Sequence, residues 1–338
     1  MTASQAIVTY EWGDFKHDPR QVLARFFDAH LYFTNWGTRV LMFRFPPGLL
    51  DPDALVPYLM DDLIALSPEA KTPILGFTFQ LEPKWEWIED EDGSLARLVS
   101  LRDDILAGDY RCIYLAWLKA VCLQDPDEQA TFEEPPVPAG LRRLTPALHQ
   151  LAKFIDLDPH LIKSAAAASP AQAPKLSEAA LRRAIGNLPR GEADDFLLRL
   201  LGGEAGLAHA LRRRLQADLL APPTADGGGR TIESLLAAAE QIKRDEAKQK
   251  AAAAEKRRIA DLEKLAQTEE QAWQTVDALL AETRWKAHEQ AVTQLQQLRG
   301  LADYQKTGAA FHRRVKQLRA KHQSRAALMK RFDRAGLA

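Results

Sequence analysis

The sequence predicts an α+β protein, in which a small antiparallel or mixed sheet with helices is followed by helices alone. Three observations predict this class. Aromatic and alternating segments typical of strands occur in residues 1–132. Segments rich in proline or glycine follow at 133–140 and 221–229, and the residues after each of them favour helix. The chain of 338 residues is long enough for about two domains.

The two breaks are predicted to be linkers, because proline excludes helix and glycine adds backbone freedom. Three of four consecutive positions in 133–140 are proline, and 221–229 ends in three glycines. The predicted domains are therefore a head at 1–132, a helical domain at 141–220 and an extended basic helical tail at 230–338.

The head is predicted to combine strands with helices. Residues 31–45 are expected to form two strands joined by a turn at 35–37, because apolar side chains alternate with others after the turn. Aspartate followed by proline marks two helix starts, at Asp18 and at Asp51, and the second helix is expected to continue through Leu66. The remaining predictions in the head are strands at 72–81 and 85–88, a turn at 89–93, and helices at 94–106 and 109–123.

The tail is predicted to open with one long helix, for which Thr231 is the cap and which runs from Ile232 to Gln267. Its centre at 241–258 has few large apolar residues, so we expect it to be exposed and stabilised by charge pairs between successive turns. Apolar residues at helical spacing predict the other helices of the chain, around 144–155, from 156 onward, and around 177–185, 192–201, 207–220, 273–280, 291–301, 311–318 and 328–332.

The end of the tail contains several short motifs. They are Trp285-Lys286-Ala287-His288-Glu289-Gln290-Ala291-Val292, Leu298-Arg299-Gly300-Leu301-Ala302, Phe311, Leu318-Arg319-Ala320-Lys321-His322 and Leu328-Met329-Lys330-Arg331-Phe332-Asp333-Arg334-Ala335-Gly336-Leu337. This stretch, about 285–337, resembles the helical tail of bacterial SWIM zinc-finger proteins. The resemblance implies a helical, solenoid-like packing element. It carries over no zinc site, because the chain has no cluster of Cys and His at ligand spacing.

Charge is unevenly distributed along the chain, although the formal net charge is −1. Residues 1–160 carry 14 basic and 25 acidic side chains, whereas residues 230–338 carry 22 basic and 14 acidic ones. This asymmetry favours an acidic or polyanionic partner for the tail, and the chain's own head is one such surface. The candidates for a basic face are Arg313, Arg314, Lys316, Arg319, Lys321, Arg325, Lys330 and Arg331.

Three tryptophans of the head are the candidate residues for binding a protein partner. Trp36 lies in the predicted turn, and Trp85 and Trp87 lie in the predicted strand at 85–88. Tryptophan is enriched among the residues that dominate binding energy at protein interfaces. The alternative is that these aromatic rings belong to the core of the head.

We expect no catalytic residues, no cofactor and no metal ligands. The chain has only two cysteines, too few for a disulfide scaffold or a Cys-rich zinc module. The glycines at 227–229 precede a helix, but no strand comes before them and no lysine follows at the offset of a phosphate loop. An enzyme stays open as an alternative, with a pocket near Asp28, His30 and Arg44 as its expected sign.

These observations favour a non-enzymatic adaptor or scaffold, with an acidic head and a basic helical tail that each bind a partner protein. The first alternative is a nucleic-acid-associated protein that binds the phosphate backbone through the tail. The long helices also permit self-association, as in a coiled coil. Residues 1–15 lack a basic region followed by an apolar core, and no apolar run could span a membrane, so we expect a cytoplasmic protein.

Overall fold

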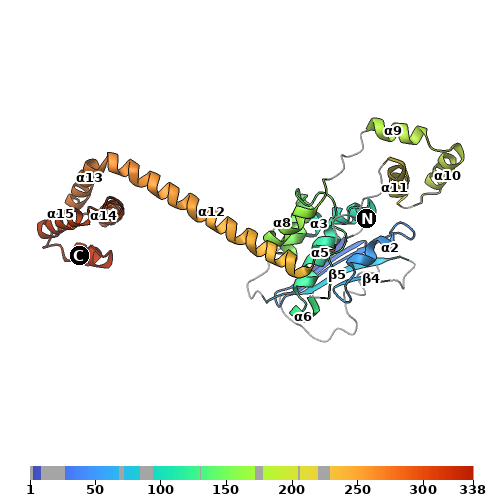
Figure 1. Cartoon of the computed structure of the whole chain (residues 1–338), viewed down its shortest axis with the longest axis horizontal. Coiled ribbons are helices and arrows are strands. Elements are labelled where there is room, and N and C mark those ends of the chain that lie inside the picture. The colour runs from blue at the N-terminus through green and yellow to red at the C-terminus, as the bar shows by residue number, and fades with distance from the viewer. Residues whose placement is uncertain are drawn as a thin grey trace. The chain divides into compact units, whose positions relative to one another are not determined.

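The structure of the protein, a computed structural model, describes residues 3–8, 27–67, 72–83, 94–129, 131–171, 178–204, 206–219 and 229–337. The elements fall into two compact units, unit 1 at Met1–Arg244 and unit 2 at Asp245–Ala338 (Figure 1). The helix predicted at Asp18, the strand at 85–88 and the turn at 89–93 lie outside the described residues. All but the last residue of the predicted linker at 221–229 also lies outside them.

Unit 1 contains a mixed sheet of five strands in the order β1-β2-β3-β5-β4. β1 is parallel to β2, and the other neighbouring strands are antiparallel. The predicted α+β class is confirmed, and so are the two strands expected within 31–45. The strands are β1 (Ala3–Val8), β2 (Ala29–Thr34), β3 (Thr38–Arg44), β4 (Ile64–Ser67) and β5 (Ile74–Gln80).

Alternate residues along β3 and its continuation to Phe45 are buried, as their spacing predicts. Leu41, Phe43 and Phe45 are each at most 1% exposed. Phe43 meets Phe77 of β5 edge to face, with ring centroids 6.4 Å apart. These side chains form the part of the core that the sheet contributes.

The helix predicted from Asp51 to Leu66 is wrong in its second half. Asp51 does cap a helix, and its side chain accepts the amide of Ala54 at 3.4 Å. The helix ends early because Pro57 has no amide to donate and Asp61 turns the chain with a φ of 30°. The residues that follow pair with β5 instead, as strand β4. The helical part consists of α2 (Pro52–Leu55) and the 3-10 helix η1 (Val56–Tyr58).

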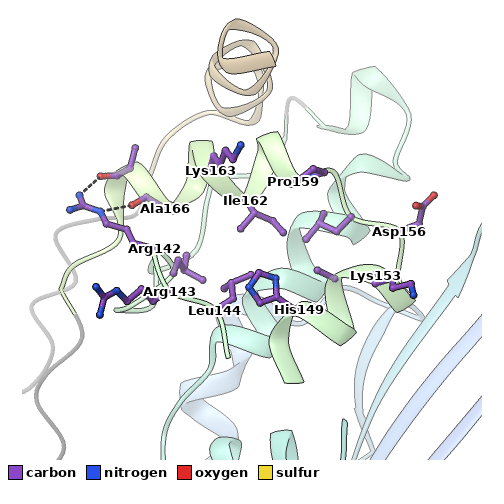
Figure 2. Close-up of a pocket in the computed structure, with 14 residues that line it drawn as sticks. Arg142, Arg143, Leu144, His149, Lys153, Asp156, Pro159, Ile162, Lys163 and Ala166 are labelled. Carbon is purple, nitrogen blue, oxygen red and sulfur yellow. Dashed lines mark hydrogen bonds between the residues drawn. The ribbon is translucent and has the colours of Figure 1, made fainter. Parts of the chain in front are cut away.

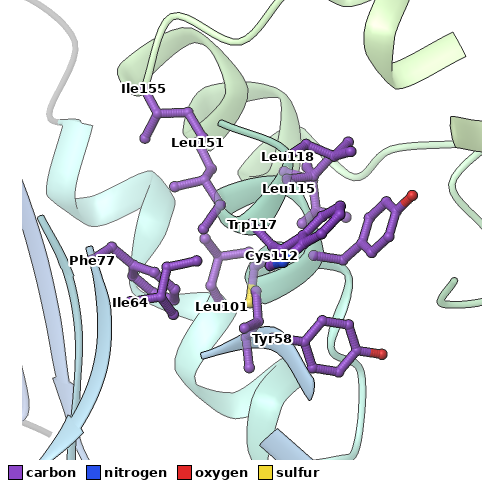
Figure 3. Close-up of a cluster of buried hydrophobic side chains, with 14 of the residues drawn as sticks. Tyr58, Ile64, Phe77, Leu101, Cys112, Leu115, Trp117, Leu118, Leu151 and Ile155 are labelled. Atoms are coloured by element: carbon purple, nitrogen blue, oxygen red, sulfur yellow. The ribbon is translucent and has the colours of Figure 1, made fainter. Parts of the chain in front are cut away.

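Helix α5 (Arg111–Cys122) is the buried centre of unit 1. Every residue from Arg111 to Leu118 is buried. The Arg111 guanidinium is neutralised by the Asp109 carboxylate at 2.6 Å. Figure 3 shows Leu115 and Trp117 of α5 in one cluster with Phe77 of the sheet and Leu151 of α7 (Pro146–Phe154). The other helices of this part are α3 (Ser94–Leu98), α4 (Ser100–Leu106), α6 (Pro126–Gln129) and α8 (Pro159–Ala168).

The division of the chain differs from the predicted boundaries at 133–140 and 141–220. Helices α7 and α8 share one hydrophobic core with the sheet. The proline-rich segment packs onto that core, because its prolines hold it extended and its carbonyls accept hydrogen bonds. Tyr58 donates to the Pro136 carbonyl at 2.6 Å, and Ser169 donates to the Pro138 carbonyl at 2.7 Å. The segment is therefore part of unit 1 and not a spacer.

A polar cluster around the buried side chain of Glu134, which we call the clasp, joins this segment to the start of α12 (Ile232–Gln267). It consists of Tyr114, Glu133, Glu134, Arg230 and Thr231. The Glu134 carboxylate is fully buried and receives two hydrogen bonds of 2.6 Å from Arg230. The Tyr114 hydroxyl also donates to it. The Glu134 amide donates to the Arg230 carbonyl at 3.1 Å, and a bridge between Glu133 and Thr231 completes the clasp.

Three further helices of the predicted helical domain at 141–220 bury few residues, and the buried ones among their described side chains are Ala184, Leu207 and Leu215. Their bounds agree with the predictions to within two residues. α10 buries none of its residues, and Leu198 and Leu201 are among its exposed leucines. The three are α9 (Glu178–Gly186), α10 (Arg190–Leu201) and α11 (Leu207–Leu219).

Helix α12 has the bounds that the sequence predicts, and at about 1.5 Å per residue its 36 residues span about 54 Å. Thr231 caps it and accepts the amide of Ser234 at 3.3 Å. Residues 247–258 are all exposed. Ion pairs between successive turns, such as Arg258 with Glu255 at 2.8 Å, stabilise this stretch without tertiary contacts.

Unit 2 is a set of short helices around its own core. The apolar residues whose spacing predicts these helices form the core of the unit, and they include Trp273, Val276, Leu298, Phe311 and Phe332. The tail is therefore predicted well from helical spacing alone. Its helices after α12 are α13 (Glu269–Ala281), α14 (Trp285–Gln305), α15 (Gly308–Lys321) and α16 (Ala326–Arg334).

Candidate functional site

Helices α7 and α8 of unit 1 line an open groove with a volume of about 1070 Å³ (Figure 2). Its walls come from both helices, from the residues before α7 and from the connection between the helices. The groove is lined by Leu141, Arg142, Arg143, Leu144, His149, Ala152, Lys153, Asp156, Leu157, Pro159, Ile162, Lys163, Ala166 and Ala167.

The local sequence specifies where these two helices begin and how the chain turns between them. Thr145 caps α7 by accepting the amide of Leu148 at 3.3 Å. Asp158 caps α8 by accepting the amide of His160 at 2.7 Å. A proline follows each cap, where its fixed φ suits the first turn of a helix. Between the helices Asp156 adopts a left-handed conformation with φ 52°, which aspartate tolerates better than most residues.

The floor of the groove is apolar. Leu144, Ala152, Leu157, Ile162 and Ala166 line it, and all but Leu144 are buried against the core below. Alanine at two of these positions leaves space that a leucine or phenylalanine would fill. The groove therefore offers apolar surface to a ligand while its helices stay anchored in the core.

The rim of the groove is basic. Arg142, Arg143, Lys153 and Lys163 lie on it, and Asp156 is the acidic residue among those that line the groove. Arg142 donates to the carbonyls of Ala166 and Ala167 at 3.2 and 3.3 Å, which caps the end of α8. Figure 2 shows both arginines at one end of the groove and Lys153 with Asp156 at the other. The excess of positive charge is therefore greatest at the arginine end.

The clasp and the start of α12 hold α8, one wall of the groove, in place. Ser164 of α8 donates to the Leu235 carbonyl in the first turns of α12 at 2.9 Å. Arg230 of the clasp donates to the Ser164 carbonyl at 3.2 Å. Helix α8 is thus held between the core and α12, and its remaining face lines the groove.

The cysteines of the chain do not lie in the groove. Both are free, and Cys112 is buried in α5. Burial raises the pKa of the Cys112 thiol well above its ordinary value, and it also raises the pKa of Cys122. Both side chains therefore stay protonated thiols at neutral pH, which are poor nucleophiles.

Of the three tryptophans proposed for partner binding, the described residues include Trp36 alone. Trp36 is half-buried in the turn between β2 and β3, and its carbonyl accepts a hydrogen bond from Gln80 at 2.8 Å. The turn is fixed by Gly37, whose φ is 106° and whose Cβ would lie 2.0 Å from the Leu81 carbonyl oxygen if it had one. Trp85 and Trp87 lie outside the described residues.

The eight residues expected on a basic face are divided between two roles. Arg314, Arg319 and Lys321 pair with acidic residues of unit 2 at 2.7, 2.8 and 3.1 Å, respectively. Arg325 donates to the carbonyl of Leu280 at 2.6 Å, and Arg331 lies 3.5 Å from a ring nitrogen of His288. These contacts join helices of the unit to one another. Arg313, Lys316 and Lys330 are exposed and form no ion pair with a described residue.

The residues expected beside an enzyme pocket lie on the sheet. Asp28 and Arg44 form an ion pair of 3.1 Å, and His30 is buried in β2. The groove is formed by α7 and α8, and none of these three residues lines it. The structure therefore places the groove away from the predicted pocket.

Comparison of the chain with protein-family models, with curated proteins and with solved structures finds no match. Within the described ranges, no helix is long and apolar enough to cross a bilayer. The sequence alone predicts no functional role for any residue that lines the groove. A usable signal was nevertheless present, because Arg142 and Arg143 lie next to two helices that begin with proline and contain alanines.

Proposed function

We propose that the protein is a cytoplasmic, non-enzymatic adaptor that binds a segment of another protein in the groove between α7 and α8. The observation that carries this proposal is the combination of an apolar floor with a basic rim. An apolar centre surrounded by polar residues is the usual anatomy of a protein-binding site.

The layout of the chain supports an adaptor rather than an isolated binding module. A single helix, α12, belongs to both compact units, and its middle is exposed over residues 247–258. Each unit has its own hydrophobic core. A partner bound to unit 1 is thus connected through a continuous helix to a second folded unit.

The alternative of a nucleic-acid-binding tail has less support. At least three of the eight proposed basic residues, Arg314, Arg319 and Lys321, are paired with acidic side chains of their own unit. Phosphate binding would have to compete with these pairs. The other five residues form no ion pair with a described residue, so the positive charge that is not offset is smaller than the sequence count of eight implies.

A photo-crosslinking experiment in cells tests the adaptor proposal. Benzoylphenylalanine replaces Lys153 on the groove rim or, as a control, Lys316 in unit 2; both positions are exposed. We expect a discrete protein adduct at position 153 that the substitution Ala167→Trp abolishes, because the indole fills the groove. The matched substitution Ala309→Trp, at an exposed position of unit 2, should leave the adduct unchanged. An adduct that survives Ala167→Trp, or no adduct at 153, would refute the proposal.

A further inference from the structure

The shape of the groove limits what kind of segment it can hold. This inference rests on the proposed function, and it concerns the chemistry of the bound partner. We propose that the groove binds an acidic amphipathic α-helix of about ten residues. The longer wall, α8, has ten residues, which corresponds to about 15 Å at 1.5 Å per residue. A partner helix of equal length would bury its apolar face along the whole floor.

A helix fits this groove better than an extended segment does. An extended strand binds by adding to an exposed sheet edge, and both walls here are helices whose backbone groups are already bonded. A proline-rich segment binds in grooves lined by aromatic rings. Among the residues that line this groove, none is Phe, Tyr or Trp. A helix that lays its apolar face into an apolar groove is the mode that remains.

The small residues of the floor favour the same mode. Ala152 of α7 and Ala166 of α8 leave room for the larger side chains of a third helix. Leu144 and Ile162 provide apolar contacts beside them, and Figure 2 shows both between the two helices. Leucines three and four positions apart on a partner helix lie on one face and can reach all four side chains.

The rim specifies the charge of the partner. Four basic side chains and one acidic side chain surround the floor. At the Lys153 end, Asp156 offsets part of the positive charge, whereas no acidic lining residue offsets Arg143. Acidic residues of the partner are therefore attracted most strongly to the arginine end. Residues 1–160 carry an excess of acidic side chains, so the basic rim of the groove is a local patch of opposite charge. This positive charge repels basic helices, which therefore do not compete for the groove.

Fluorescence anisotropy with synthetic peptides on the full chain tests this inference. The probe is a helical peptide with leucine at i, i+3, i+4 and i+7 and glutamate at its polar positions. One comparison peptide replaces every glutamate by lysine, and a second replaces every leucine by serine while it keeps the charge. We expect the acidic amphipathic peptide to bind at least about tenfold more tightly than either comparison peptide, because it alone matches both floor and rim.

Protein variants locate the binding to the groove. Arg143→Glu should weaken binding of the acidic peptide more than Lys153→Glu does, because Asp156 already offsets Lys153. The matched reversals Arg313→Glu and Lys316→Glu, at exposed positions of unit 2, should leave it unchanged. Arg143 and Lys153 have exposed side chains, so reversal should leave the helical circular dichroism unaltered.

Three outcomes would overturn the inference. Equal binding of the lysine peptide would exclude an acidic partner, and equal binding of the serine peptide would show that a polyanion alone suffices. No binding of the acidic peptide would exclude this partner chemistry altogether. The crosslinking result separates these outcomes from a failure of the proposed function: an adduct at position 153 would still identify the groove as a protein-binding site, with a partner of different chemistry.

Discussion

Both compact units contain an arginine that binds a glutamate through two hydrogen bonds, yet the two pairs differ in burial. In unit 1, Arg230 binds Glu134 with two bonds of 2.6 Å, and the glutamate side chain is 0% exposed. In unit 2, Arg314 binds Glu270 with bonds of 2.9 and 2.7 Å, and that glutamate is 65% exposed. The geometry is nearly the same and the arginines are similarly exposed, at 29% and 39%, so the difference between the pairs lies in the access of the glutamates to water.

This difference separates the two ways in which the units are stabilised. Removal of one partner from a buried pair leaves a charge without water or a counterion, which is strongly unfavourable. Removal of one partner from an exposed pair lets water take its place, at little cost. Both units have an apolar core, and unit 1 depends on the clasp in addition, whereas the exposed pair adds little to unit 2.

The largest expected effect is that of Arg230→Met. It leaves the buried Glu134 carboxylate with the Tyr114 hydroxyl as its side-chain donor. We expect unit 1 to lose about 3–5 kcal/mol of unfolding free energy, the usual cost of breaking a buried pair. Protection of β3 and α5 amides against hydrogen exchange measures this loss in unit 1 separately from unit 2.

The double variant Glu134→Gln with Arg230→Met is the control for that effect. It removes both charges, so no carboxylate is buried without a counterion, and it should recover most of the stability that the single variant loses. Protection of α15 amides in unit 2 should be the same in both variants. A cost of less than about 1 kcal/mol for Arg230→Met would mean that the clasp behaves like the exposed pair.

An intermediate effect is expected from His322 at the end of α15. Its side chain is 8% exposed, and its Nε2 atom has no hydrogen-bond partner among the described residues. Burial lowers the pKa of His322. The neighbouring Arg325, Lys321 and His288 lower this pKa further, whereas Asp277 raises it. Because the folded pKa lies below the unfolded one, the unfolded state binds more protons as the pH falls below the ordinary value of 6.5. Unit 2 should therefore lose stability as the pH falls through 6.5 toward the lower pKa of the folded state.

This pH dependence is measured from the protection of α15 amides, corrected at each pH for the intrinsic exchange rate. His322→Gln cannot be protonated in this range, so the variant should show a smaller loss on acidification than the natural chain. A histidine resonance assigned to His322 that titrates at or above the ordinary value would contradict the prediction.

The smallest effect is expected from Glu270→Gln. Arg314 lowers the pKa of Glu270 by hydrogen bonding, but the glutamate is exposed and water replaces the lost contact. Arg314 still lies over the ring of Trp273, 4.6 Å from its centroid. We expect a small decrease in the urea midpoint of unit 2 at low salt and none at high salt. A large decrease that persists in high salt would show that this pair resembles the clasp after all.

Unit 2 is the part of the chain that local sequence predicts best. Phe311, Val315 and Leu318 have the spacing of one helix face, and all three are buried on α15. The prediction fails where contacts with residues distant in sequence determine the secondary structure. Leu63 and Leu66 have helical spacing with Leu59, but pairing with β5 makes Ile64–Ser67 a strand.

The groove and the clasp could not be predicted for a related reason. Glu134 and Arg230 are 96 positions apart, and neither differs in sequence from an ordinary surface charge. Arg142, Arg143 and Lys163 likewise gain significance only when α7 and α8 pack side by side. The same argument applies to the tail, where a count of basic residues cannot say that Arg319 is paired with Asp333.

The separation of 96 positions between Glu134 and Arg230 also sets an order of events during synthesis of the chain. At about 5–20 residues per second, Arg230 is made about 5–20 s after Glu134. Until then the carboxylate has no arginine to bind, and α8 lacks the turns of α12 that support it. The sheet and α5 can assemble while the chain is still being translated. The groove reaches its final form only after the first turns of α12 have left the exit tunnel. The groove of a nascent chain therefore lacks its full support until most of unit 1 has been translated.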